Sequence, residues 1–211
     1  MKTNRFIYIF VAIVLSQLNM AAQVYNSSDL YFKEAKNDIA NKNFTKAAKM
    51  SWRGLKISPN DLDLKTLLGK ANLELGRYDT ARYVLKQVYL KNRKNIDILK
   101  YLVNIEQATN RYSDAICFVN ELLEITPYWK GLWIRKITIY REMGNYVEAE
   151  KLFDASLGES QDIKHTARAT FWKAETDYNL TNYDDALIGF KQFQQQTNAS
   201  QTPEYKNLDY N

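Results

Sequence analysis

The residues that most often perform chemistry in proteins are scarce in this chain of 211 residues. His165 is the only histidine and Cys117 is the only cysteine. Histidine-based metal clusters, Ser-His-Asp triads and intrachain disulfides therefore each lack a component. The sequence also has no glycine-rich phosphate-binding loop. We expect no catalytic residue, no metal and no cofactor.

The remaining reactive side chains have structural interpretations. Cys117 stands between Ile116 and Phe118, where a free cysteine is expected to act as a small buried hydrophobe. Two pairs of acidic residues follow aromatic residues at expected helix starts: Glu148 and Glu150, and Asp184 and Asp185. Acidic side chains at a helix start stabilise the helix dipole, so these pairs indicate electrostatic rather than catalytic roles.

Aromatic-x-x-Ala pairs recur along the chain at a nearly constant interval. The five pairs are Phe44/Ala47, Tyr78/Ala81, Tyr112/Ala115, Tyr146/Ala149 and Tyr183/Ala186. The first four aromatic residues are 34 residues apart, and the fifth follows after 37. A sustained period of this length is typical of a stacked helix–turn–helix array, which presents surfaces to other proteins.

Composition and charge agree with a helical interaction protein. Apolar residues make up 45% of the chain, which is enough for a core, and only three prolines and seven glycines are present. The net charge of the chain is +5. Without Lys2 and Arg5 it falls to +3, because 27 basic and 24 acidic residues then remain. Such a mild excess argues against nucleic acid as the partner.

The segment 62–95 resembles the tetratricopeptide repeat most clearly. It carries Leu68-Gly69, Gly76, Tyr78 and Ala81 at the spacing of that family. The resemblance covers residues 28–196 and implies an all-α, right-handed α-solenoid of about five helix pairs. The implied repeats lie near 28–61, 62–95, 96–129, 130–163 and 167–196.

Each repeated position has a mechanical reason. The alanine of each pair must be small, because the two helices of a repeat cross there at close range. Gly76 and Gly144 can end the first helix in a left-handed conformation. We expect Asn43 and Asn110 to take the same place in their repeats, since asparagine tolerates that conformation.

The resemblance also implies a binding groove, lined by the first helix of each repeat. The residues expected to line it are Lys70, Lys100, Asn104, Gln107, Thr138, Arg141 and Arg168. Their mixed polarity suits an extended peptide or a segment of a partner protein.

A sharper version of this groove is a clamp for a partner's C-terminal carboxylate. Some tetratricopeptide domains build it from lysine, asparagine and arginine on three first helices. Lys100 and Asn104 match its first pair at i, i+4 spacing. At the other positions Arg135 replaces the asparagine of the clamp, Arg168 its lysine and Trp172 its arginine. Solvated helix surface is the other interpretation of these residues.

Trp129 lies outside the core pattern of the repeat. It is therefore a candidate exposed contact, and with the neighbouring aromatic residues it leaves a glycan- or peptidoglycan-binding protein as an alternative function.

The N-terminus has the three parts of a secretory signal peptide. Lys2 and Arg5 precede the apolar stretch 6–18, and Ala21-Ala22 follow it. We predict cleavage after Ala22, so that 1–22 is the signal and 23–27 a short linker. An uncleaved anchor remains the other interpretation. The style of the sequence resembles exported Bacteroidetes proteins, and the periplasm, with peripheral outer-membrane association, is the expected location.

The C-terminal end shows no separate capping helix. Residues 197–211 are a polar tail, so the Phe190 and Phe193 end of the array is expected to be partly exposed. It would meet a partner, a second copy of the chain or a further domain. The sequence thus predicts a non-enzymatic scaffold for an envelope protein or peptide, with no nucleic-acid partner.

Overall fold

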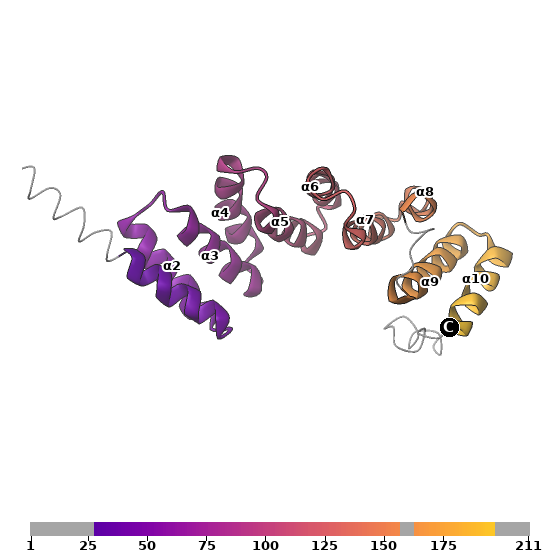
Figure 1. Cartoon of the computed structure of the whole chain (residues 1–211), viewed down its shortest axis with the longest axis horizontal. Coiled ribbons are helices and arrows are strands. Elements are labelled where there is room, and N and C mark those ends of the chain that lie inside the picture. Colours follow the sequence, from indigo (N-terminus) through magenta and orange to yellow (C-terminus); the bar gives the residue numbers. More distant parts are fainter. Residues whose placement is uncertain (1–27, 157–162, 197–211) are drawn as a thin grey trace, which may run out of the picture. The chain divides into compact units, whose positions relative to one another are not determined.

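The computed structural model describes residues 28–156 and 163–196. Within these ranges all regular structure is helical and no strand is present (Figure 1). The N-terminal apolar stretch and the polar tail lie outside the described residues. None of the described helices is long and apolar enough to cross a membrane.

The described helices follow one another in pairs. A first helix covers residues 28–40. The others are α2 (Phe44–Ile57), α3 (Leu62–Glu74), α4 (Tyr78–Lys91), α5 (Ile96–Ala108), α6 (Tyr112–Ile125), α7 (Lys130–Glu142), α8 (Tyr146–Ser156), α9 (Ile163–Asn179) and α10 (Tyr183–Gln195). The predicted all-α array of helix pairs is confirmed.

The second helix of each pair begins at the aromatic residue of the repeated motif. Phe44, Tyr78, Tyr112, Tyr146 and Tyr183 are the first residues of α2, α4, α6, α8 and α10. The alanine three residues later is fully or almost fully buried in all five helices. A larger side chain at this position would hold the two helices of a pair apart, so the motif fixes where the pair crosses.

Tight turns connect the two helices of each pair. The residue two places before the aromatic has a positive φ in every turn, and these residues are Lys42, Gly76, Asn110, Gly144 and Thr181. The expectation for Asn110 is confirmed, but the one for Asn43 is wrong. Asn43 has φ −84°, and its neighbour Lys42 takes the left-handed conformation with φ 59°.

Close approach between helices depends on small residues. A Cβ on Gly69 of α3 would lie 2.4 Å from Cγ of Leu85 in α4, and one on Gly189 of α10 would lie 2.8 Å from Cβ of Ala174 in α9. Both distances are too short for real carbon atoms, so glycine is needed where these helices pack. Side-chain caps begin two of the first helices: Asp61 accepts a hydrogen bond from the Leu64 amide and Asn95 from the Asp97 and Ile98 amides.

The chain divides into two compact units, one ending at Thr109 and the other beginning at Asn110. In the first unit, consecutive helices from α2 to α5 pack on one another, and the first helices α3 and α5 also touch. In the second unit, consecutive helices from α6 to α10 pack on one another. Because contacts join near neighbours in sequence, each unit is built from local packing.

Candidate partner-binding surface

The seven residues predicted to line the groove all lie on the first helices of their pairs. Lys70 is on α3 and three more are on α5: Lys100, Asn104 and Gln107. These belong to the first unit. Thr138 and Arg141 are on α7 and Arg168 is on α9 of the second unit. In each unit we refer to the exposed parts of these first helices, α3 and α5 in the first unit and α7 and α9 in the second, as its first-helix surface.

In the first unit, Lys70 bridges two neighbouring helices. Its Nζ lies 6.0 Å from the ring centroid of Tyr101 on α5, at the outer limit of a cation–π contact. Lys100 Nζ lies 4.0 Å from a carboxylate oxygen of Asp97 on its own helix, and the two side chains are 40% and 76% exposed. Asn104 is exposed and Gln107 is half-buried. This part of the surface is polar and partly exposed to solvent.

In the second unit, α7 and α9 bring together a cluster that the sequence did not predict as a whole. The guanidinium carbons of Arg141 and Arg168 lie 5.1 Å and 5.7 Å from the ring centroid of Trp172. Arg141 also forms an ion pair with Glu175 of α9. We call these four residues the arginine–tryptophan cluster. It joins two predicted groove residues to Trp172 and Glu175.

Spacing alone does not reveal this cluster. Arg141 and Glu175 are 34 residues apart, but the equivalent turn residues Gly144 and Thr181 are 37 apart. Glu175 therefore corresponds to Thr138 of α7 rather than to Arg141. Thr138, by contrast, uses its hydroxyl within its own helix, where it donates to the Ile134 carbonyl over 3.0 Å.

Helix α7 is strongly basic. It carries four cationic residues, Lys130, Arg135, Lys136 and Arg141, and one acidic residue, Glu142. Burial lowers the pKa of Arg135, with Glu142 opposing the shift, and burial also lowers the pKa of Lys136, with Glu148 opposing it. Cations held in partly dehydrated places gain from an added anion, so this helix favours a partner that carries carboxylates.

The residues of the expected carboxylate clamp fall in both units. Lys100 and Asn104 lie on α5 of the first unit, whereas Arg135 and Arg168 lie on α7 and α9 of the second. Trp172 occupies the position at which the clamp has an arginine. Its ring instead makes cation–π contacts with Arg141 and Arg168.

Trp129 precedes α7 as its N-cap residue. Its side chain is 42% exposed, and that of the adjacent Tyr128 is 94% exposed. The indole of Trp133 donates to the Pro127 carbonyl over 3.0 Å, which ties the start of α7 to the preceding turn. Two exposed aromatic residues therefore stand side by side in sequence on a turn that is held in place.

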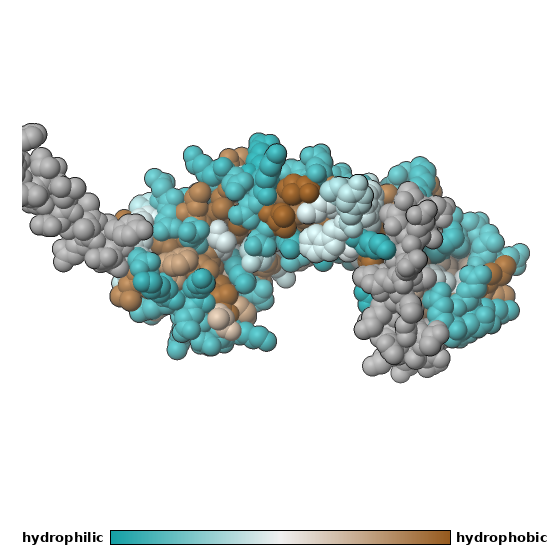
Figure 2. Space-filling model, in the orientation of Figure 1, coloured by the Kyte–Doolittle hydropathy of each residue, from teal (hydrophilic) through white to brown (hydrophobic). Residues whose placement is uncertain are grey.

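Two expectations about individual side chains are wrong. Cys117 is exposed, because the buried side of α6 carries Ala115, Phe118, Val119, Leu122 and Leu123 instead. Phe193 is fully buried and packs edge-to-face on Phe171 of α9, with the half-buried Phe190 beside it. On the face of the molecule seen in Figure 2 hydrophilic residues predominate and hydrophobic ones show only in patches.

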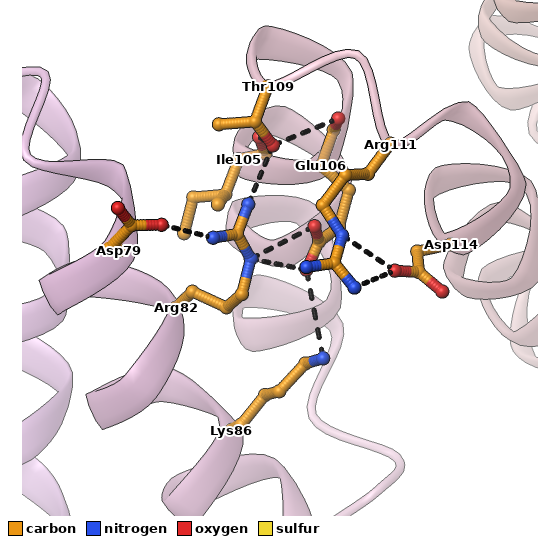
Figure 3. Close-up of polar contacts among 8 residues, drawn as sticks. All are labelled: Asp79, Arg82, Lys86, Ile105, Glu106, Thr109, Arg111 and Asp114. Atoms are coloured by element: carbon orange, nitrogen blue, oxygen red, sulfur yellow. Dashed lines mark hydrogen bonds and ion pairs between the residues drawn. The ribbon is translucent and has the colours of Figure 1, made fainter.

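A second polar cluster that the sequence did not predict lies between α4 and α5 (Figure 3). The Glu106 side chain is 0% exposed and accepts two hydrogen bonds of 3.0 Å from Nε of Arg82. The other nitrogens of Arg82 donate to Asp79 over 2.7 Å and to Thr109 over 2.6 Å. All three acceptors are thus paired with one guanidinium, and the cluster fastens one repeat to the next.

The described part of the chain contains no candidate metal site. No group of three or more histidine, cysteine, aspartate or glutamate residues there could hold a metal ion.

Comparison with known proteins agrees with the geometry. The family model described as tetratricopeptide repeat matches residues 72–133, which run from α3 into α7. Residues 72–133 of the chain therefore carry the tetratricopeptide repeat. No curated protein sequence is similar to it.

Solved structures with the same tetratricopeptide architecture are similar over most of the chain. A crystal structure of the MamA protein has a TM-score of 0.69 at 15% identity, covering 84% of this chain and 96% of that one. A tetratricopeptide repeat protein from Parabacteroides merdae has a TM-score of 0.67 at 20% identity, covering 80% of this chain and 66% of that one. At these identities the likeness establishes the fold.

Proposed function

We propose that this protein is a non-enzymatic scaffold that binds a peptide or a segment of a partner protein through its first-helix surface. Tetratricopeptide arrays commonly serve protein–protein interaction, because stacked helix pairs create extended surfaces. The observation that carries the proposal is the arginine–tryptophan cluster, in which Arg141 and Arg168 both make cation–π contacts with the ring of Trp172. Two planar cations on one aromatic ring offer fixed hydrogen-bond donors to a carboxylate.

The chemistry of α7 narrows the kind of partner segment. This helix contains four cationic residues and a single acidic one. Arg141 already forms an ion pair with the carboxylate of Glu175 on α9. A partner segment that contains aspartate or glutamate, or ends in a free carboxylate, would extend this pairing. We infer that such an acidic segment binds to the first-helix surface of the second unit.

The proposed location is the bacterial periplasm, within an envelope assembly, export or outer-membrane machine. The support is the signal-peptide pattern of residues 1–22. A scaffold exported in this way would meet envelope proteins as its partners.

Affinity capture from the native host tests the proposal. Wild-type protein is compared with the double variant Arg141→Gln and Arg168→Gln, and with a control, Arg77→Gln and Arg93→Gln, which removes two exposed arginines outside α7 and α9. We expect the first variant to lose a specific envelope protein that wild type and control retain. Equal capture by all three proteins would exclude the cluster as the binding site.

A glycan-binding function is a second candidate, favoured by the exposure of Tyr128 and Trp129. Adjacent exposed aromatic rings provide flat apolar surfaces on which sugar rings can pack. Titration with peptidoglycan fragments would show quenching of tryptophan fluorescence that is lost in Trp129→Ala. Absence of quenching in the wild-type protein would remove this candidate.

A further inference from the structure

Helix α2 carries an unusual set of charges. Its fourteen residues include four basic residues and no acidic one. The basic residues are Lys46, Lys49, Arg53 and Lys56, and all four are exposed. Since α2 contributes none of the predicted groove residues, these charges are separate from the first-helix surface.

The four cations form one row along the helix. Their spacing of three, four and three residues keeps them within an arc of about 80°, because each residue turns the helix by about 100°. The opposite side of α2 is buried and consists of small and apolar residues: Ala47, Ala48, Ser51, Gly54 and Leu55. The row therefore points away from the protein and extends over most of a helix about 21 Å long.

Trp52 borders this row. Its side chain is 55% exposed, and Nζ of Lys56 lies 5.2 Å from its ring centroid. A tryptophan beside a row of cations is the combination found where helices meet the headgroup region of a membrane. We call Lys46, Lys49, Trp52, Arg53 and Lys56 the α2 basic face.

The cations of the α2 basic face have no anionic side chain as a partner among the described residues. In the described part of the chain none of the four forms an ion pair, whereas Arg82 is paired with Glu106 and Arg141 with Glu175. Keeping four like charges close together without a counter-charge costs free energy. An external anionic surface would remove that cost.

We propose that the α2 basic face binds the surface of an anionic phospholipid membrane. A straight row of exposed cations matches a plane of phosphate headgroups, and each lysine or arginine near such a surface strengthens binding about five-fold. Trp52 is the one large apolar residue of the face, so binding is superficial and falls steeply with salt.

Helix α8 of a second copy is a poor match for this face. It is rich in acidic residues, but Glu148 is 2.6 Å from Lys151 and Glu150 is 3.8 Å from Lys173. These carboxylates are already paired within one copy, so they offer little to the α2 basic face of another.

Co-sedimentation of the full chain with vesicles tests the proposal. The vesicles are phosphatidylcholine alone, or an equimolar mixture of phosphatidylcholine and phosphatidylglycerol. The test variant is Lys46→Gln, Lys49→Gln and Lys56→Gln. The matched control is Lys91→Gln, Lys94→Gln and Lys191→Gln, which removes three exposed lysines elsewhere. Residues 1–27 are the same in all proteins, so their contribution cancels in the comparison.

We expect the test variant to bind the anionic vesicles about 100-fold more weakly than wild type, since three cations are lost. The control should bind like wild type apart from a small general loss, and Lys46→Arg, Lys49→Arg and Lys56→Arg should retain binding. Trp52→Ala should weaken binding several-fold, because it removes one aromatic residue from the membrane interface.

Three results would overturn the proposal. The first is equal loss of binding in the test variant and the control. The second is equal binding of the wild-type protein to neutral and anionic vesicles. The third is that binding to anionic vesicles does not depend on α2, while sedimentation velocity shows a salt-sensitive self-association that the test variant abolishes. That third result would assign the face to a second copy of the chain. None of these results bears on partner capture through Arg141 and Arg168.

Discussion

At the scale of single residues, the Arg82–Glu106 pair shows how burial changes the weight of a charge. Glu106 is fully buried and Arg82 is 12% exposed, whereas Arg111 and Asp114 form a pair of similar length with side chains 51% and 41% exposed (Figure 3). Water screens the exposed pair, and such pairs contribute little to stability. Removing Glu106 takes the buried counter-charge from Arg82, which then keeps only the exposed carboxylate of Asp79.

We expect Glu106→Ala to lower the free energy of unfolding by about 3–5 kcal/mol. Asp114→Ala, which removes a carboxylate from the exposed pair, should cost less than about 1 kcal/mol. Urea unfolding followed by circular dichroism measures both. Similar losses in the two variants would show that the buried pair is not a special contributor.

The pH dependence of this pair follows from Arg82. Burial alone would lower its pKa, but hydrogen bonds and charge from Glu106 and Asp79 outweigh burial, and the pKa is raised above its ordinary value. A raised pKa gives stability that is fully present below the ordinary arginine value and is lost only as pH rises through the higher folded value. The difference in stability between wild type and Glu106→Ala should therefore not decline between neutral and mildly alkaline pH.

A repeat comparison could have predicted the burial of Glu106, although its own charge argues against it. Asn72 stands 34 residues earlier at the equivalent position and is also buried. The arginine–tryptophan cluster was harder to predict. The extra residues before α9 shift the register of the last repeat, so Trp172 could not be aligned with Arg141 from spacing alone.

At the scale of the elements, the turns between paired helices all require a left-handed residue. Glycine adopts this conformation without steric cost, whereas a β-branched residue does so under strain. Thr181 has φ 67° in the turn before α10, where Gly144 has φ 74° in the turn before α8. The same turn is thus built with very different side chains.

We expect Thr181→Gly to raise the free energy of unfolding by about 1 kcal/mol, because strain in the turn is relieved. Gly144→Ala should lower it by a similar amount, about 1 kcal/mol. A Cβ on Gly144 would meet no atom within 4 Å, so the backbone conformation alone is tested there. Thermal unfolding of the two variants gives the measurement, and a loss of stability in Thr181→Gly would contradict the account.

The helices were predictable because the aromatic-x-x-Ala motif records a packing requirement at every crossing. The orientation of single side chains was less so. Cys117 and Phe193 stand in mixed apolar stretches, where the sequence alone does not show which side of a helix faces its neighbour. Asparagine favours the left-handed conformation, which is why the sequence pointed to Asn43. The turn instead requires this conformation two residues before the aromatic, and that residue is Lys42.

At the scale of the whole molecule, charge is distributed unevenly between the two units. The second helix α2 of the first unit has four basic residues and no acidic one. In the second unit the basic helix is a first helix, α7, while the second helix α6 has three acidic residues, Asp114, Glu121 and Glu124, and no basic one. Although the net charge is modest, the protein therefore has two basic surfaces. The α2 basic face suits a membrane, and the surface of α7 suits an acidic partner segment.

The export proposal makes a prediction for the intact protein. We expect the chain isolated from its host to begin at Gln23, because a signal peptidase would cleave after Ala22. Mass spectrometry of the N-terminal peptide measures this. A chain that retains Met1 and its apolar stretch 6–18 would instead support an uncleaved anchor, and one recovered from the cytoplasm would contradict export.

The central claim is that partners bind to the first helices of the repeats. The most direct measurement places a photo-reactive residue in the native host at Thr138 of α7, one turn before Arg141, and at Gln192 of α10, an exposed position on a second helix. We expect a specific cross-linked protein from Thr138 that Arg141→Gln with Arg168→Gln abolishes, and no such product from Gln192. Specific cross-links from Gln192 alone would contradict binding to the first helices.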